Sequence, residues 1–166
     1  MLIEILCKSS EELRRSEISE FIKDGVYFGE ELVFIPSDSS PEMSDVDWNT
    51  LEVQYQKGKK PIIIERYTED IIVFTEICSE KLVSIKESGD KDFAEFERCV
   101  TKTKQIFVLA FDAVSIDEDC WAMLDSLESF ITGKLEGMIF SDEGIYNEKL
   151  KRVFEFNKTF KIEQLD

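Results

Sequence analysis

The chain has 166 residues, of which 43% are hydrophobic and 11% aromatic, and this is the size and apolar content of one folded domain rather than of a disordered chain. Its 36 acidic and 20 basic residues leave a net charge of −16, which disfavours binding to nucleic acid or to an anionic membrane. The sequence has no histidine, which excludes the commonest general base, the Ser-His-Asp and Cys-His arrangements, and the commonest zinc ligand.

No apolar run is long enough to cross a bilayer, and the first residues lack the positively charged start of a secretory signal, so we expect a cytoplasmic protein. The chain shows no linker, repeat or low-complexity segment, which predicts a single domain over residues 1–166. The cysteines lie far apart and form no CxxC pair. We expect reduced, buried thiols at Cys7, Cys78, Cys99 and Cys120.

The start of the chain predicts a strand followed by a helix. Residues 2–6 form a short apolar run typical of a strand. Ser9 precedes Glu12 by three positions, which is the spacing of a capping box. This spacing predicts a helix over 10–23, and Gly25 is expected to end it.

The next segments predict short strands around a surface loop. Residues 26–28 and 32–35 predict two short strands or a hairpin. Residues 37–49 combine Ser, Asp and Pro as surface loops do. Apolar and polar residues then alternate over 51–55, and extended structure resumes at 61–64, so we expect a hairpin with one buried face.

Two helices and a buried strand follow. Thr68 can cap a helix whose apolar residues recur at spacings of three and four as far as Ile85, although residues 71–74 also fit a strand. A shorter helix is predicted over 92–104. Residues 106–111 form a continuous apolar run, which is typical of a strand at the centre of a sheet with both faces covered.

The clearest predicted element is a helix that begins with the acids at 117–119 and ends at Leu135. Its apolar stripe includes Trp121 and leaves Glu128 outside, so Trp121 is expected to pack in the core rather than to contact a ligand.

Three strands complete the predicted fold. They are expected at 138–140, 145–146 and 153–162, and the first two are joined by a turn in which Gly144 supplies a positive φ. These elements together predict an α+β fold with a single, mostly antiparallel sheet packed by three to four helices.

The acidic excess is concentrated in two stretches. Residues 24–56 contain eight acids and no base, and residues 105–133 contain six acids and no base, so the two stretches carry 14 of the 16 excess charges. They form an acidic face if they adjoin in space. The residues that we predict to bind a partner are Asp38, Glu42, Asp45, Asp47, Trp48, Asp117, Glu118 and Asp119.

Trp48 is included because a tryptophan flanked by charge on a surface loop is a common anchor of protein interfaces. The alternative is that Trp48 folds back onto the sheet and belongs to the core.

Carboxylate chemistry is the catalytic option that the sequence leaves open. The acids of 37–49, those of 112–119, and the pair Asp142 and Glu143 offer the hard oxygen ligands that Mg²⁺ and Ca²⁺ take. A divalent-metal-dependent hydrolase is therefore one alternative function. No cluster matches a calcium-binding loop, and no phosphate-binding motif occurs, so we predict no bound metal and no cofactor.

The concentrated acidity favours a different function, the neutralisation of a basic protein. A nuclease needs a positive groove for phosphates, and an acidic inhibitor can occupy that groove through complementary charge. The leading hypothesis is therefore a binding protein without enzymatic activity. An acidic adaptor or inhibitor subunit of a nucleic-acid enzyme is a further alternative.

One segment carries a resemblance. A helix ending in Leu135, followed by Gly137-x-Ile139-x-x-Asp142-Glu143-Gly144-Ile145-Tyr146, resembles the C-terminal part of some small bacterial immunity proteins encoded beside polymorphic or contact-dependent toxins. The resemblance implies an immunity role and a toxin nuclease as the partner. It carries no individual binding residue across to this chain.

Overall fold

The computed structural model describes residues 1–37, 45–88 and 93–156. Within this part of the chain the strands are β1 (Leu2–Cys7), β2 (Val33–Ile35), β3 (Thr50–Gln54), β4 (Ile62–Thr68), β5 (Gln105–Ala110), β6 (Gly137–Phe140), β7 (Gly144–Tyr146) and β8 (Arg152–Glu155). The helices are α1 (Arg15–Asp24), α2 (Ile72–Glu87), α3 (Phe93–Thr101) and α4 (Glu118–Leu135).

The strands form one eight-stranded sheet in the order β2-β3-β4-β5-β1-β6-β7-β8, and every neighbouring pair is antiparallel. With four helices packed on this sheet, the predicted α+β class and the antiparallel sheet are confirmed. None of the helices in the described ranges is long and apolar enough to span a membrane.

Strand β5 lies at the centre of the sheet, as its continuous apolar run predicts. Phe107 and Leu109 belong to the core on one face, and Ile106 and Val108 belong to the core on the other. All four side chains are buried because alternate residues of a strand point to opposite faces, and helices cover this strand on both.

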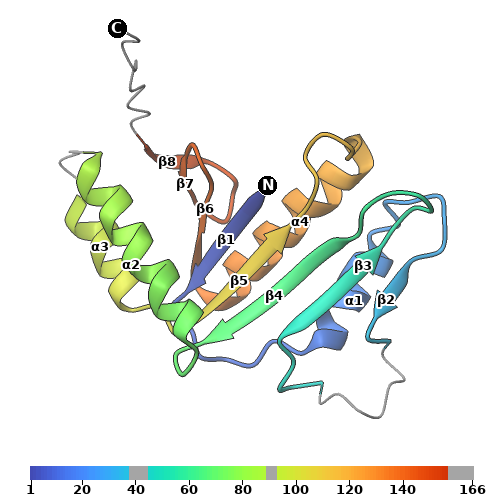
Figure 1. Cartoon of the computed structure of the whole chain (residues 1–166), viewed down its shortest axis with the longest axis horizontal. Helices are drawn as coiled ribbons and strands as arrows, with labels where there is room; N and C mark the ends of the chain where they lie inside the picture. Colours follow the sequence, from blue (N-terminus) through green and yellow to red (C-terminus); the bar gives the residue numbers. More distant parts are fainter. Residues whose placement is uncertain (38–44, 89–92, 157–166) are drawn as a thin grey trace, which may run out of the picture.

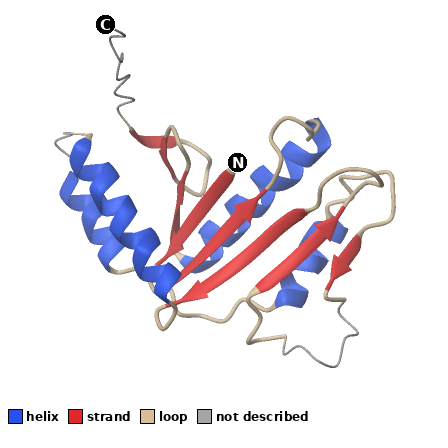
Figure 2. Cartoon of the chain, viewed as in Figure 1, coloured by secondary structure: helices blue, strands red, loops and turns tan. Residues whose placement is uncertain are grey.

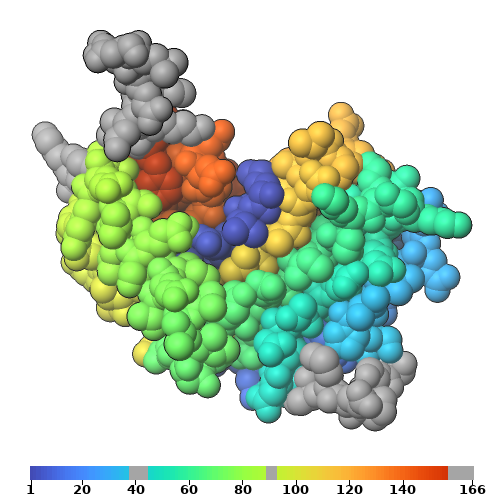
Figure 3. Space-filling model, in the orientation of Figure 1, coloured from blue at the N-terminus to red at the C-terminus, as the bar shows by residue number. Residues whose placement is uncertain are grey.

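The helices lie on both sides of the sheet (Figures 1 and 2). Helices α1 and α4 cover one face and enclose the larger core, which includes Ile5, Leu51 and Leu127. Helices α2 and α3 form a hairpin over part of the other face, where Leu6 and Phe140 contribute to the second core. Beside this hairpin, β3 and β4 reach the surface in the view of Figure 3.

Helix α1 begins later than the sequence predicts. Ser9 Oγ accepts a hydrogen bond from the Glu11 backbone N–H at 3.1 Å, so Ser9 forms a local turn instead of opening a helix. The helix begins at Arg15, where Glu17 Oε2 accepts a hydrogen bond from the Arg14 backbone N–H at 2.8 Å. Arg14 is the N-cap although its side chain has no acceptor oxygen, so the residue types at the helix start pointed to Ser9 instead.

Other predicted boundaries also shift. Residues 26–28 are not a strand, and Phe28 packs against Tyr55 with a ring distance of 5.2 Å. Thr68 ends strand β4 and does not cap a helix. Helix α2 begins at Ile72 with Ile71 as its N-cap, so residues 71–74 follow the predicted helix and not the alternative strand. The last strand ends at Glu155, and residues 157–162 of the predicted strand lie outside the described residues.

Gly144 has a different role from the one predicted. It is not among the residues with positive φ; Gly58 is the glycine in that region within the described part of the chain. A Cβ atom on Gly144 would overlap the Phe154 carbonyl oxygen on the neighbouring strand β8. Gly144 therefore permits the close approach of two strands instead of a turn with positive φ.

The four cysteines are free thiols, as expected. Three are buried and Cys78 is partly exposed.

Candidate functional site

Residues 45–49, directly before β3, carry three of the predicted partner-binding residues, and Asp45 has a structural role. Asp45 accepts hydrogen bonds from the Ser16 backbone N–H at 2.8 Å and from Ser16 Oγ at 2.6 Å. The Arg15 backbone N–H donates to the Asp45 carbonyl oxygen at 3.0 Å. Partial burial favours a raised pKa for Asp45, but the hydrogen bonds from Ser16 outweigh it and lower the pKa below its usual value. Asp45 therefore stabilises the start of α1.

Trp48 is not an exposed anchor, and that prediction is wrong. Its side chain is 1% exposed and packs against Phe107 with a ring distance of 5.9 Å. The indole N–H donates to the Leu13 carbonyl oxygen at 2.7 Å. The alternative interpretation holds, because Trp48 folds back onto the sheet and fills the space between β5 and the segment that leads into α1.

The remaining predicted residues of this stretch differ in their placement. Asp47 is exposed and contributes a favourable charge interaction to Arg66. Arg66 in turn donates to the Val46 carbonyl oxygen at 3.2 Å. Asp38 and Glu42 lie outside the described residues.

The acids at the start of α4 are exposed, as predicted. Asp117 is the N-cap of the helix, and its Oδ1 accepts a hydrogen bond from the Cys120 backbone N–H at 3.0 Å. Glu118 and Asp119 follow in the first turn, where the helix dipole favours negative charge. A lysine lies close by, because Lys59 Nζ donates to the Ser115 carbonyl oxygen.

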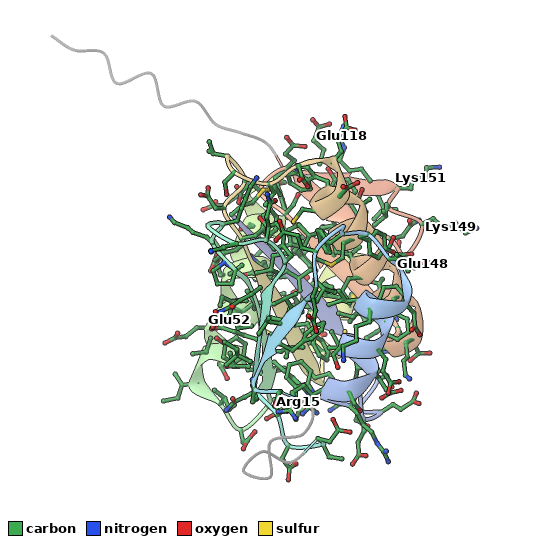
Figure 4. The ribbon with its side chains drawn as sticks, turned by 90° about the vertical axis from the view of Figure 1, so that its right-hand side faces the viewer. Arg15, Glu52, Glu118, Glu148, Lys149 and Lys151 are labelled. Carbon is green, nitrogen blue, oxygen red and sulfur yellow. The ribbon has the colours of Figure 1, made fainter. Side chains whose placement is uncertain are left out.

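The structure separates the two groups of predicted acids. Asp45 and Asp47 precede β3 at one end of the sheet, whereas the start of α4 lies at the other end (Figure 1). Figure 4 shows the same separation, with Glu118 at one end of the molecule and Arg15, whose backbone contacts Asp45, near the other. The predicted residues therefore do not form one continuous site.

A pocket that the sequence did not predict lies between α4 and the sheet. It has a volume of about 430 Å³. Its walls come from the start of the chain and β1, the first half of α4, β6, the β6–β7 turn, β7 and the loop before β8. The residues that line it are Met1, Ile3, Trp121, Asp125, Glu128, Ile139, Ser141, Asp142, Glu143, Tyr146 and Leu150.

Glu128 is the most unusual of these residues. The sequence placed it outside the apolar stripe of α4, but it is 5% exposed. Its Oε1 is buried, and no hydrogen-bond donor in the described part of the chain reaches that oxygen. Burial, together with the nearby charge of Asp125, raises the pKa of Glu128 to about 8. Glu128 thus has the environment of a functional carboxyl and not that of a surface glutamate.

The rest of the pocket is apolar at its base and acidic at its rim. Ile3 and Ile139 are buried beneath it, and Trp121 is partly buried against the core. Asp125 lies one helical turn before Glu128 with its side chain exposed, and partial desolvation of its carboxyl raises its pKa. Trp121 therefore both packs in the core, as expected, and lines a pocket.

The arrangement does not favour metal or nucleophilic chemistry. In the described ranges, no group of three or more Asp, Glu or Cys side chains is placed to hold a metal ion. Burial raises the pKa of the Cys78 and Cys120 thiols to about 11, so neither is a thiolate at neutral pH. The pocket is instead suited to hold a positively charged group.

Comparisons of the chain with models of protein families, with curated proteins and with solved structures give no match. The resemblance to immunity proteins therefore stays a prediction.

A signal for Glu128 was present in the sequence. Glu128 follows Leu124 by four positions and precedes Ile131 by three, which is the spacing of the buried stripe of α4. A charged residue at such a position indicates a buried carboxyl. The pocket itself had no such signal, because its walls come from distant parts of the chain.

Proposed function

We propose that this chain is a binding protein that neutralises a basic protein by covering its working surface, and that the partner is a toxin nuclease. The observation that carries the proposal is the set of acids on α4 and the segment before it. Ion pairs of the described residues engage Glu4, Glu17, Glu69, Glu80 and Glu155. None of them engages an acid of the stretch 105–133.

Such acids favour a partner of opposite charge. Exposed carboxylates that lack an intramolecular cation keep their full negative potential, and this potential increases the association rate with a basic surface. A nuclease fits the same argument, because it presents a positive groove to its substrate. Lys59 lies near the start of α4, where it donates to the Ser115 carbonyl oxygen. Lys149 and Lys151 lie in the loop that contacts α4 through Ser129, so the acidic surface has basic borders (Figure 4).

The first experiment is affinity capture from the native host at low and then raised salt, followed by mass spectrometry of the bound proteins. We expect one basic protein that salt releases. A nuclease assay then tests whether the chain inhibits the captured protein. Failure to capture any basic protein, or capture of one whose activity the chain leaves intact, contradicts the proposal.

Two double variants locate the interface. Glu118→Lys with Asp119→Lys reverses charge at the start of α4, whereas Glu76→Lys with Glu87→Lys makes the same change on the opposite side of the sheet. We expect the α4 variant to slow association with the captured protein by about tenfold or more at low salt, and the α2 variant to change it little. Equal effects of the two variants would indicate non-specific attraction instead of an interface on α4.

A further inference from the structure

The pocket beside α4 contains an acceptor without a donor. Glu128 is 95% buried, given its exposed fraction of 5%, and its Oε1 has no hydrogen-bond partner in the described ranges. A carboxylate that is removed from water without a donor is strongly destabilised. A ligand that brings positively charged donors into the pocket would remove this penalty, because it supplies both the hydrogen bonds and the opposite charge.

A second carboxyl strengthens the attraction for a cation. Asp125 is three residues before Glu128 on the same face of α4, and both side chains line the pocket. Asp125 is exposed, so it lies toward the mouth of the pocket while Glu128 is at its base. The two carboxyls destabilise each other when both are ionised, and one cation between them relieves the repulsion.

The other walls restrict the kind of cation. Trp121 and Tyr146 provide aromatic surfaces, which attract organic cations, and Ile3 and Ile139 provide an apolar base. A metal ion needs several oxygen ligands, and among the described residues no three carboxylates or thiols converge on one point. A neutral donor would supply a hydrogen bond to Glu128 but no opposite charge, and an anion would be repelled by the two carboxyls.

We propose that this pocket binds an ammonium or guanidinium group carried on an alkyl chain, with Glu128 as the acceptor at the base and Asp125 as a second acceptor at the mouth. The alkyl chain lies against the apolar and aromatic walls. Two sources offer this group, a lysine or arginine side chain of a basic protein and a free organic amine. The first source rests on the proposed function and the second does not.

The test uses the full chain and three small probes. N-acetyl-lysine amide and N-acetyl-arginine amide carry the two cations, and N-acetyl-norleucine amide is a neutral analogue of similar length. Each is titrated while the backbone amide signals of the isotopically labelled chain are followed by NMR. We expect saturable shifts for one or both cationic probes, confined to residues around the pocket in α4, β6 and the β6–β7 turn, and no binding of the neutral probe.

Glu128→Gln is the decisive variant, because it keeps the shape of the side chain and removes its charge. We expect it to weaken binding of the cationic probes by about tenfold or more. The control is Glu20→Gln, which removes one exposed charge from α1, outside the pocket, and is expected to change the affinity less than about twofold. Equal effects of the two variants, binding of the neutral probe, or no binding of either cationic probe overturns the proposal.

The pH dependence provides a measurement on the unaltered chain. Affinity for the cationic probes should increase by about tenfold or more from pH 6 to pH 8.5, since Glu128 must lose its proton to pair with a cation. The other ionisable groups at the pocket are Asp125, Asp142, Glu143, the Tyr146 hydroxyl and the Met1 amino group, which donates to the Phe111 carbonyl oxygen. The affinity of the Glu128→Gln variant should no longer depend on pH in this range. If the pH dependence remains in that variant, one of these other groups causes it, and the proposal is contradicted.

The outcomes separate this inference from the proposed function. Binding of the cationic probes without capture of any basic protein supports the pocket and contradicts the proposed function. Capture of a basic protein together with no binding of either cationic probe supports the proposed function and contradicts the cation pocket. A third outcome is that the chain binds the cationic probes and also captures a basic protein. If the Glu128→Gln variant then fails to capture that protein, a lysine or arginine side chain of the protein is the occupant of the pocket. If the variant captures the protein equally well, the occupant is a free amine.

Discussion

Glu128 and Asp45 are acidic side chains whose environments shift their pKa values in opposite directions. Burial against an apolar wall raises the pKa of Glu128 from its usual value of 4.5 to about 8. Asp45 is only partly buried, and the two hydrogen bonds from Ser16 stabilise its ionised form. The two carboxyls are therefore expected to affect the free energy of unfolding at different pH values.

Glu128→Gln is expected to stabilise the chain in alkaline solution. Because the pKa is raised on folding, the folded state holds an extra proton between about pH 4.5 and pH 8, so stability falls as pH rises through this range. The glutamine variant lacks this penalty. It should match the parent chain at pH 4.5 and exceed it at pH 9 by at most about 5 kcal/mol, measured by urea unfolding. A stability difference that does not vary with pH contradicts the assignment, and Glu118→Gln is the control.

Asp45→Ala is expected to destabilise the chain by about 1 kcal/mol at pH 7, because the backbone N–H and the hydroxyl of Ser16, in the first turn of α1, lose their acceptor. The lowered pKa means that this contribution is present above about pH 4 and is lost as the pH falls below it. The variant and the parent should therefore converge in acid. Glu20→Ala, an exposed change on the same helix, is the control in thermal unfolding at several pH values. If Asp45→Ala destabilises the chain no more than Glu20→Ala does, the Asp45 side chain does not stabilise the start of α1.

At the scale of elements, strands β7 and β8 depend on the small size of one residue. Gly144 pairs with Glu155, and the pairing has an irregular register between Ile145 and Tyr146. The close approach of the Phe154 carbonyl leaves no room for a Cβ atom on Gly144. The end of the sheet that holds Tyr146 of the pocket is thus sensitive to a single methyl group.

Gly144→Ala is expected to lower the free energy of unfolding by about 1 to 3 kcal/mol, because β8 must move away from β7. Hydrogen exchange of the β7 and β8 amides should be faster in the variant than in the parent chain, whereas exchange of the β5 amides should change less. Gly29→Ala is the matched control, since a Cβ atom there meets nothing within 4 Å. Unchanged exchange in β8 would mean that the strands accommodate the methyl group.

At the scale of the whole molecule, the net charge of −16 opposes folding through self-repulsion. Salt screens this repulsion. We therefore expect the melting temperature to rise when NaCl is increased from about 10 mM to about 300 mM. The double change Glu76→Lys with Glu87→Lys adds four charge units and gives a net charge of −12, so its melting temperature should depend less on salt. Equal salt dependence in the two chains would exclude long-range repulsion as the cause.

The sequence by itself determined the class of the fold and most of its elements. Apolar spacing of three and four predicted α2, α3 and α4, alternation predicted β3, and a continuous apolar run predicted the central strand β5. These patterns are local, since each reports which face of one element avoids water. The predicted start of α1 was wrong because Ser9 fits the capping pattern and Arg14, the actual N-cap, does not; the start of the helix is instead held by Asp45, from a distant part of the chain.

Only the tertiary structure decided what the individual polar residues do. Trp48 is buried because it meets the Leu13 carbonyl, which is 35 positions away in the chain, and Asp45 caps a helix 29 positions away. Glu128 is buried because α4 packs next to β1 and the β6–β7 turn. Such environments arise from segments that are distant in sequence, so the burial and charge partners of a side chain follow from the packing of elements and not from its own neighbours in the chain.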